Sequence, residues 1–128
     1  MTSRKLFAAA AFVFVALSAG RAFAGEDALA EVNAARAARG LAPYLRDDNL
    51  TAGAKHVADF RAQRLIEGHT GNDFGGLPVG TTASASGCAA WQQGMGWGSC
   101  CTYERWTYAG AAYAIGRDGR RYMQLFVR

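Results

Sequence analysis

Cysteine, histidine and proline are scarce in this sequence: its 128 residues include three, two and two of them, respectively. The cysteines and histidines do not follow the spacings of known zinc sites. The glycine-rich stretches GGLPVG and GMGWG lack the pattern of a phosphate-binding loop after a strand, and Ser84 and Ser86 lack a nucleophile-elbow motif. The sequence therefore shows no familiar motif for metal, nucleotide or serine-hydrolase chemistry.

Long apolar runs are also absent after the first residues, so no later segment predicts a membrane span. The N-terminus has two basic residues, a short apolar run at 6–19 and an A-x-A site at 22–24. This order is typical of a cleaved signal peptide. We therefore expect residues 1–24 to be removed and residues 25–128 to form one secreted or periplasmic domain.

Most of the net positive charge comes from this leader. Its removal lowers the number of basic residues from 14 to 11 against 10 acidic ones, so the formal net charge falls from +4 to +1. Nucleic-acid binding normally needs a basic face, and the remaining local cluster is Arg117, Arg120 and Arg121. We interpret this cluster as a solvated hairpin tip and expect no nucleic-acid partner.

The three cysteines offer a covalent staple for a small domain. Export implies an oxidising compartment, in which Cys88, Cys100 and Cys101 permit one bridge and leave one thiol over. Adjacent cysteines bridge each other only with strain, so we expect Cys88 to pair with Cys100 or with Cys101. A metal site built from these thiols is the alternative interpretation.

The stretch 47–70 predicts a long amphipathic helix. One stripe at helical spacing carries Leu50, Ala54, Val57, Phe60, Arg61 and Leu65. Asp47 and its neighbours suit the first turn, and Gly68 can take the left-handed conformation that closes a helix. His69 then follows the helix end, where a positive charge is favoured. His56, inside the helix, is expected to be packed or to act as a cap.

Three further segments complete the expected fold. Residues 28–39 predict a first helix with Leu29, Val32 and Ala35 facing inward, and residues 82–93 predict a short helix pinned by the disulfide. Residues 106–115 and 121–127 read as two strands around an Asp-Gly turn. Both faces of this hairpin are apolar, which favours a sheet between helical layers, and the small residues from Gly110 onward would let a helix approach closely.

The segment EVNAARAARGLAPYLRDDNLTAGAKHVADFRAQRLIEGHTG resembles the opening of the CAP superfamily, or SCP domain, which includes cysteine-rich secretory proteins, venom antigens and pathogenesis-related proteins. The ending AGAAYAIGRDGRRYMQLFVR is similar to the closing strands of that family. The matching residues in this sequence are Asn33, Arg36, Gly40, Leu41, Pro43, Asp47, Leu50, Ala54, His56, His69 and Trp91.

This resemblance implies an α-β-α sandwich with a small antiparallel sheet and a C-terminal hairpin. Many members carry two histidines and two glutamates around a cleft that sometimes holds a metal, and some bind sterols or other lipids. His69 matches one of these histidines, which makes it a weak metal candidate. The Gly-Glu-Asn segment and the second histidine of the family pattern are missing. We therefore expect no catalytic residues, metal or other cofactor.

The favoured interpretation is a monomeric, non-enzymatic binding module whose cleft is formed by His69, Trp91 and Trp97, for a lipid, a sterol or a protein partner. The aromatic residues can equally belong to the core. A hydrolase that uses His69 with Asp73 or Glu67 is the first alternative. A structural protein of the cell envelope is the second.

Overall fold

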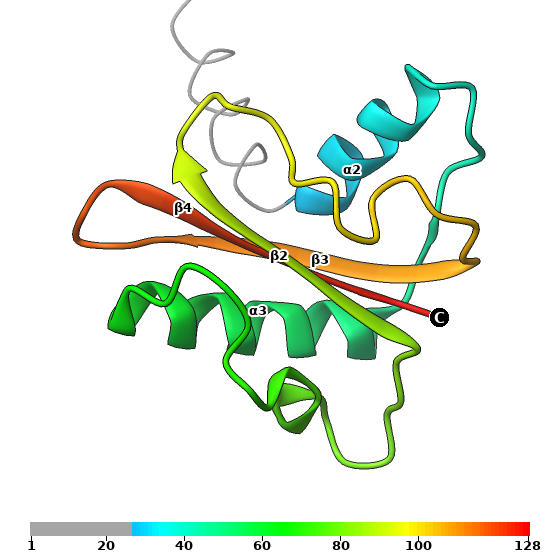
Figure 1. Ribbon diagram of the computed structural model, residues 1–128. Coiled ribbons are helices and arrows are strands. Elements are labelled where there is room, and N and C mark those ends of the chain that lie inside the picture. Colours follow the sequence, from blue (N-terminus) through cyan, green and yellow to red (C-terminus); the bar gives the residue numbers. More distant parts are fainter. Residues whose placement is uncertain (1–26) are drawn as a thin grey trace, which may run out of the picture.

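The computed structural model describes residues 27–128, and the expected signal peptide lies outside this range. The described residues form two α-helices, a short 3-10 helix and a four-stranded sheet (Figure 1), which confirms the predicted α+β class. In chain order the elements are α2 (Ala28–Ala37), β1 (Leu45–Arg46), α3 (Asp48–Arg64), η1 (Asp73–Gly76), β2 (Ala85–Gln92), β3 (Tyr108–Ile115) and β4 (Arg120–Val127). None of the helices in this part of the chain is long and apolar enough to cross a bilayer.

The strands lie in the order β1-β3-β4-β2. β3 and β4 form the predicted C-terminal hairpin, and β2 pairs antiparallel with the other side of β4. β1 runs parallel to β3, with Leu45 opposite Tyr108. The sheet is therefore mixed, and not purely antiparallel as expected. The reason is that β1, in the short connection before α3, pairs with the edge of β3 that β4 leaves free.

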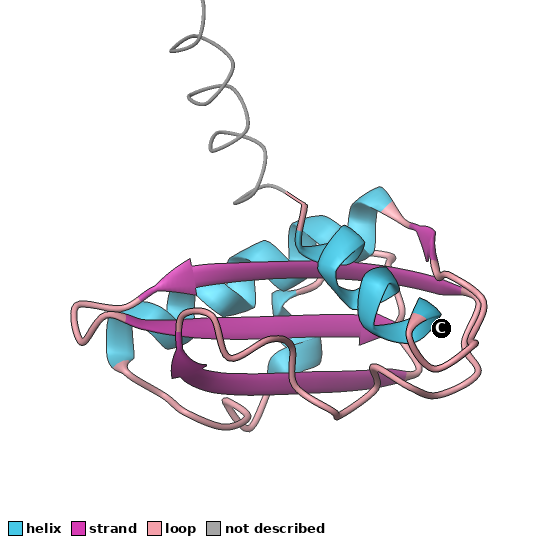
Figure 2. Cartoon of the chain, turned by 90° about the horizontal axis from the view of Figure 1, so that it is seen from above, coloured by secondary structure: helices cyan, strands magenta, loops and turns pink. Residues whose placement is uncertain are grey.

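The sheet lies between the two helices. Figure 1 shows α2 and the loop 93–107 on one face and α3 with η1 on the other, and Figure 2 shows the three long strands side by side. The core on the α2 side contains Ala28, Leu29, Val32, Tyr44, Cys101, Ala109, Ala111, Leu125 and Val127. The core on the α3 side contains Leu50, Ala54, Val57, Ala58, Ala112 and Phe126. The hairpin is thus covered on both of its apolar faces.

A close contact joins α3 to β3 at Gly110. A Cβ atom at this position would lie 2.0 Å from the backbone nitrogen of Thr51 and 2.1 Å from the carbonyl carbon of Leu50. Only glycine leaves room for the helix backbone here. The predicted close approach of a helix to this small-residue strand is confirmed.

Helix α3 begins as predicted but ends earlier. The Asp47 side chain accepts a hydrogen bond from the Leu50 amide at 2.8 Å, which caps the first turn. The helix ends at Arg64, and Leu65 rather than Gly68 takes the left-handed conformation, with φ of 55°. The early turn brings the carbonyls of the following loop to the guanidinium of Arg61, which is completely buried.

The prediction of a short helix at 82–93 is wrong, because this segment contains strand β2. Cys88 and Trp91 are three residues apart, a spacing that fits a helix. The backbone of this segment instead pairs with the outer edge of β4, whose backbone groups would otherwise be unpaired. In the strand, Ser86, Cys88 and Ala90 point to the α3 side. Gly87, Ala89 and Trp91 point to the α2 side.

The three cysteines are free thiols in the structure. Cys88 lies on the α3 side of β2, whereas the backbone of Cys100 packs against Gly87 on the opposite side. Cys88 and the other two cysteines therefore lie on opposite sides of β2, and the expected bridge from Cys88 is not formed.

The three arginines of the hairpin have different surroundings. Arg117 and Arg120 lie near the turn, where Arg120 pairs with Glu67. Arg121 is only 8% exposed, and its guanidinium binds Glu31 with an N–O distance of 2.9 Å. The expectation of one solvated cluster is therefore wrong for Arg121, because the alternation of β4 turns it toward α2.

Candidate functional site

The candidate site is the loop that leaves α3 and enters η1. His69 and Asp73 both belong to it and are four residues apart. Asp73 Oδ1 accepts hydrogen bonds from the Thr70 amide at 2.9 Å and from the Thr70 hydroxyl at 2.8 Å. Gly71 has φ of 88°, a conformation that residues with a side chain rarely adopt. Glycine at this position therefore lets the chain fold back over the carboxylate.

A chain of side-chain hydrogen bonds connects this loop to the sheet. Asp73 Oδ2 pairs with Nδ1 of His69 and accepts a hydrogen bond from Ser86 Oγ at 2.7 Å. Ser86 Oγ in turn accepts from Nε2 of Gln124 at 2.7 Å. The network thus runs from an exposed loop through β2 to the central strand β4.

The Asp73 carboxylate is buried, with 5% of the residue exposed. Burial alone would raise its pKa, but the hydrogen bonds from the Thr70 amide, His69, Ser86 and the Thr70 hydroxyl together lower the pKa to about 2. Asp73 is therefore ionised at neutral pH. Its negative charge holds the imidazole of His69 through Nδ1.

The other edge of the His69 ring faces outward. The side chain is 52% exposed, and Nε2 has no hydrogen-bond partner among residues 27–128. A ring fixed at Nδ1 and open at Nε2 can donate to or accept from a bound molecule.

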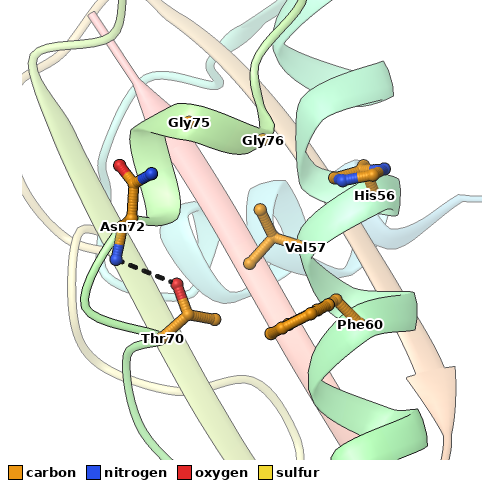
Figure 3. A pocket seen from close by; sticks show the side chains of 7 residues that line it. All are labelled: His56, Val57, Phe60, Thr70, Asn72, Gly75 and Gly76. Atoms are coloured by element: carbon orange, nitrogen blue, oxygen red, sulfur yellow. Dashed lines mark hydrogen bonds between the residues drawn. The ribbon is translucent and has the colours of Figure 1, made fainter.

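Two open hollows lie beside this loop. One, of about 360 Å³, is lined by His69, Gly71, Asn72, Asp73, Phe74 and Ser86. The other, of about 260 Å³, is lined by His56, Val57, Phe60, Thr70, Asn72, Gly75 and Gly76. In Figure 3, Val57 and Phe60 project from α3 toward the loop, and Thr70 and Asn72 stand on the opposite side. Each hollow is lined by both apolar and polar groups.

Close contacts hold the loop in place. A Cβ atom on Gly76 would lie 2.5 Å from Val57, and one on Gly53 would lie 2.5 Å from the side chain of Leu77. Arg61 also donates hydrogen bonds to the carbonyls of Glu67 and Gly68. The loop is thus fixed against α3 on both sides of His69.

The sequence-predicted cleft residues are not brought together. Trp91 donates a hydrogen bond to the Gly96 carbonyl at 3.1 Å, and Trp97 packs against the core on the α2 side. His69 lies on the α3 side, across the sheet. His56 is exposed and lines the second hollow, so it is neither a buried histidine nor a cap.

The structure adds Thr70, Ser86 and Gln124 to His69 and Asp73. The four-residue spacing of the histidine and the aspartate is visible in the sequence. Ser86 is 13 residues from Asp73, and Gln124 is 38 residues from Ser86, so no local pattern marks either residue. Glu67, considered beside Asp73, pairs with Arg120 instead.

Within residues 27–128, no group of three or more histidine, cysteine, aspartate or glutamate side chains is arranged to hold a metal ion. No protein-family model matches the sequence, and no curated protein matches it.

Proposed function

We propose that this chain is a divergent, exported domain of the CAP type that works as a monomeric, non-enzymatic binding module. The surface around the loop 69–76 is its ligand face. The sheet between two helices agrees with the sandwich of that family, and the sequence resemblance covers most of the expected mature domain.

The observation that carries this proposal is the direction of the hydrogen bonds in the network. Ser86 donates to Asp73 and accepts from Gln124, so its hydroxyl is bound to the acid and not to the imidazole. A serine nucleophile needs the imidazole as its base, and the carboxylate should orient that base from the far side. This arrangement leaves Ser86 unactivated, while His69 keeps Nε2 open toward a bound molecule.

The shape of the site favours a protein partner over a lipid. Both hollows are open and small, whereas a lipid needs an enclosed apolar cavity. Phe74 is 49% exposed beside His69, and its ring centroid lies 5.9 Å from that of Phe126, which supports it from below. An exposed aromatic ring that lines a hollow beside His69 is a typical anchor for side chains of a partner.

Selection of peptides from a random display library on the immobilised chain tests this proposal. We expect the selected peptides to lose at least tenfold in affinity for the Phe74→Ala variant. Ile115→Ala is the matched control, because Ile115 is 47% exposed at the far end of the sheet, and it should bind like the unchanged chain. Equal losses in both variants would contradict the site. Native mass spectrometry showing a retained lipid would favour the apolar ligand instead.

A further inference from the structure

Cys100 and Cys101 place two thiols side by side in the loop between β2 and β3. Their Sγ atoms are 3.9 Å apart. Cys100 is exposed, whereas Cys101 is 3% exposed and belongs to the core on the α2 side. The Cys100 thiol is therefore accessible to solvent, whereas the neighbouring Cys101 thiol is buried.

The backbone around the pair is fixed. The Tyr44 hydroxyl donates a hydrogen bond to the Cys101 carbonyl at 2.6 Å. A Cβ atom on Gly87 would lie 2.3 Å from the Cys100 carbonyl oxygen, so β2 packs tightly against this peptide group. Cys101 also has φ of 64°, a strained conformation for a residue with a side chain. The surrounding contacts thus hold the two thiols as neighbours.

Cys88 is separated from the pair by the strand that carries it. Ser86 and Cys88 point to the same side of β2, and the bond from Ser86 to Asp73 shows that this is the α3 side. Cys101 lies in the core on the other side. The sulfur partner within reach of Cys100 is therefore Cys101, and the two thiols form a hydrogen bond.

We propose that Cys100 and Cys101 are a redox-active vicinal pair that a low-molecular-weight disulfide, such as glutathione disulfide, converts into an internal disulfide, while Cys88 takes no part. This pairing differs from the bridge that cysteine spacing alone favours, because spacing does not show on which side of a strand each thiol lies.

The reaction proceeds by two exchanges. The exposed Cys100 loses its proton to solvent, and its sulfur attacks glutathione disulfide, forming a mixed disulfide and releasing one glutathione. Cys101 then loses its proton, and its sulfur attacks Cys100 Sγ, which breaks the mixed disulfide and releases the second glutathione. The pair loses two protons and two electrons, and glutathione disulfide is reduced to two glutathione molecules.

The burial of Cys101 sets the rate of the second exchange. Burial, together with the neighbouring Cys100 thiol, raises the pKa of Cys101 to about 12. The thiolate is the attacking species, so ring closure should speed up about tenfold for each pH unit between pH 7 and pH 10. The small ring formed by adjacent cysteines is strained, so we expect the pair to be reduced again by excess glutathione.

The test is oxidation of the reduced full chain with glutathione disulfide, followed by intact mass measurement and peptide mapping. The unchanged chain and Cys88→Ser should each lose two hydrogens and map to a Cys100–Cys101 bridge. Cys101→Ser should stop at the mixed disulfide on Cys100. A bridge that includes Cys88, a failure of Cys88→Ser to close the ring, or no oxidation of the unchanged chain would overturn the proposal.

Discussion

Substitution of Asp73 by asparagine tests whether an ionised carboxylate holds the site together. Asp73 accepts four hydrogen bonds, from the Thr70 amide and hydroxyl, from Ser86 and from His69. An asparagine keeps one oxygen for Thr70 but presents an amide group to Ser86 and His69. The charge-assisted part of the network is therefore lost, while the size of the side chain is unchanged.

The lowered pKa of Asp73 gives the size of the expected loss of stability and its dependence on pH. A decrease from about 4 in the unfolded chain to about 2 in the folded chain corresponds to about 2 kcal/mol of stability. Because the folded-state pKa is the lower one, this stability is present in full above pH 4 and is lost as the pH falls through 2. We expect Asp73→Asn to unfold about 2 kcal/mol more easily at pH 7, about 1 kcal/mol at pH 3, and almost equally easily at pH 2.

Urea unfolding of both proteins at several pH values between 7 and 2 measures this difference. Asp59→Asn is the matched control, since Asp59 forms an exposed pair with Lys55 on α3 and should change stability by less than about 0.5 kcal/mol. A difference between Asp73→Asn and the unchanged chain that stays constant with pH would refute the role of the charge. So would a loss no larger than that of the control.

Three other substitutions test contacts that hold α3, the site loop and the cysteine loop in place. Arg61→Met should lower the free energy of unfolding by about 3 kcal/mol or more, because it leaves buried carbonyls of the loop and of β4 without donors; thermal unfolding by circular dichroism checks this. Gly110→Ala should cost about 3 kcal/mol because its Cβ would overlap the backbone of α3, whereas Gly68→Ala, with no atom within 4 Å, should stay within about 0.5 kcal/mol in the same urea titration. Tyr44→Phe should lose about 1 to 2 kcal/mol, since its buried hydroxyl donates to the loop that carries Cys101, and an unchanged unfolding midpoint would refute that role.

The interpretation of α3 from sequence was accurate at its start and inaccurate at its end. Asp47 caps the helix through a local bond to the Leu50 amide, and sequence spacing shows such bonds directly. The end depends on Arg61, whose guanidinium binds carbonyls of the loop, of β2 and of β4. Arg61 belongs to the predicted apolar stripe, but in the structure its buried guanidinium holds the loop against α3 and the sheet, and only the folded chain brings its partners together.

The segment 82–93 shows the same limit for secondary structure. Its residues fit a short helix as well as they fit a strand, and the choice is made by β4, which pairs with β2 residue by residue from Ala85 to Gln92. Ser86 enters the site for this reason alone. A strand places it opposite Phe126 and within reach of Asp73, and a helix would not.

Periodicity, caps and turns act over a few residues, so the α+β class, the two main helices, the C-terminal hairpin and the position of His69 after α3 could all be predicted from the sequence. Three features could not be predicted from it: the partners of His69, the position of Trp91 and Trp97 across the sheet from it, and the separation of Cys88 from the other two thiols. These features depend on strand pairing and on the side of the sheet to which each residue points, and both are fixed by contacts between segments that are distant in the chain.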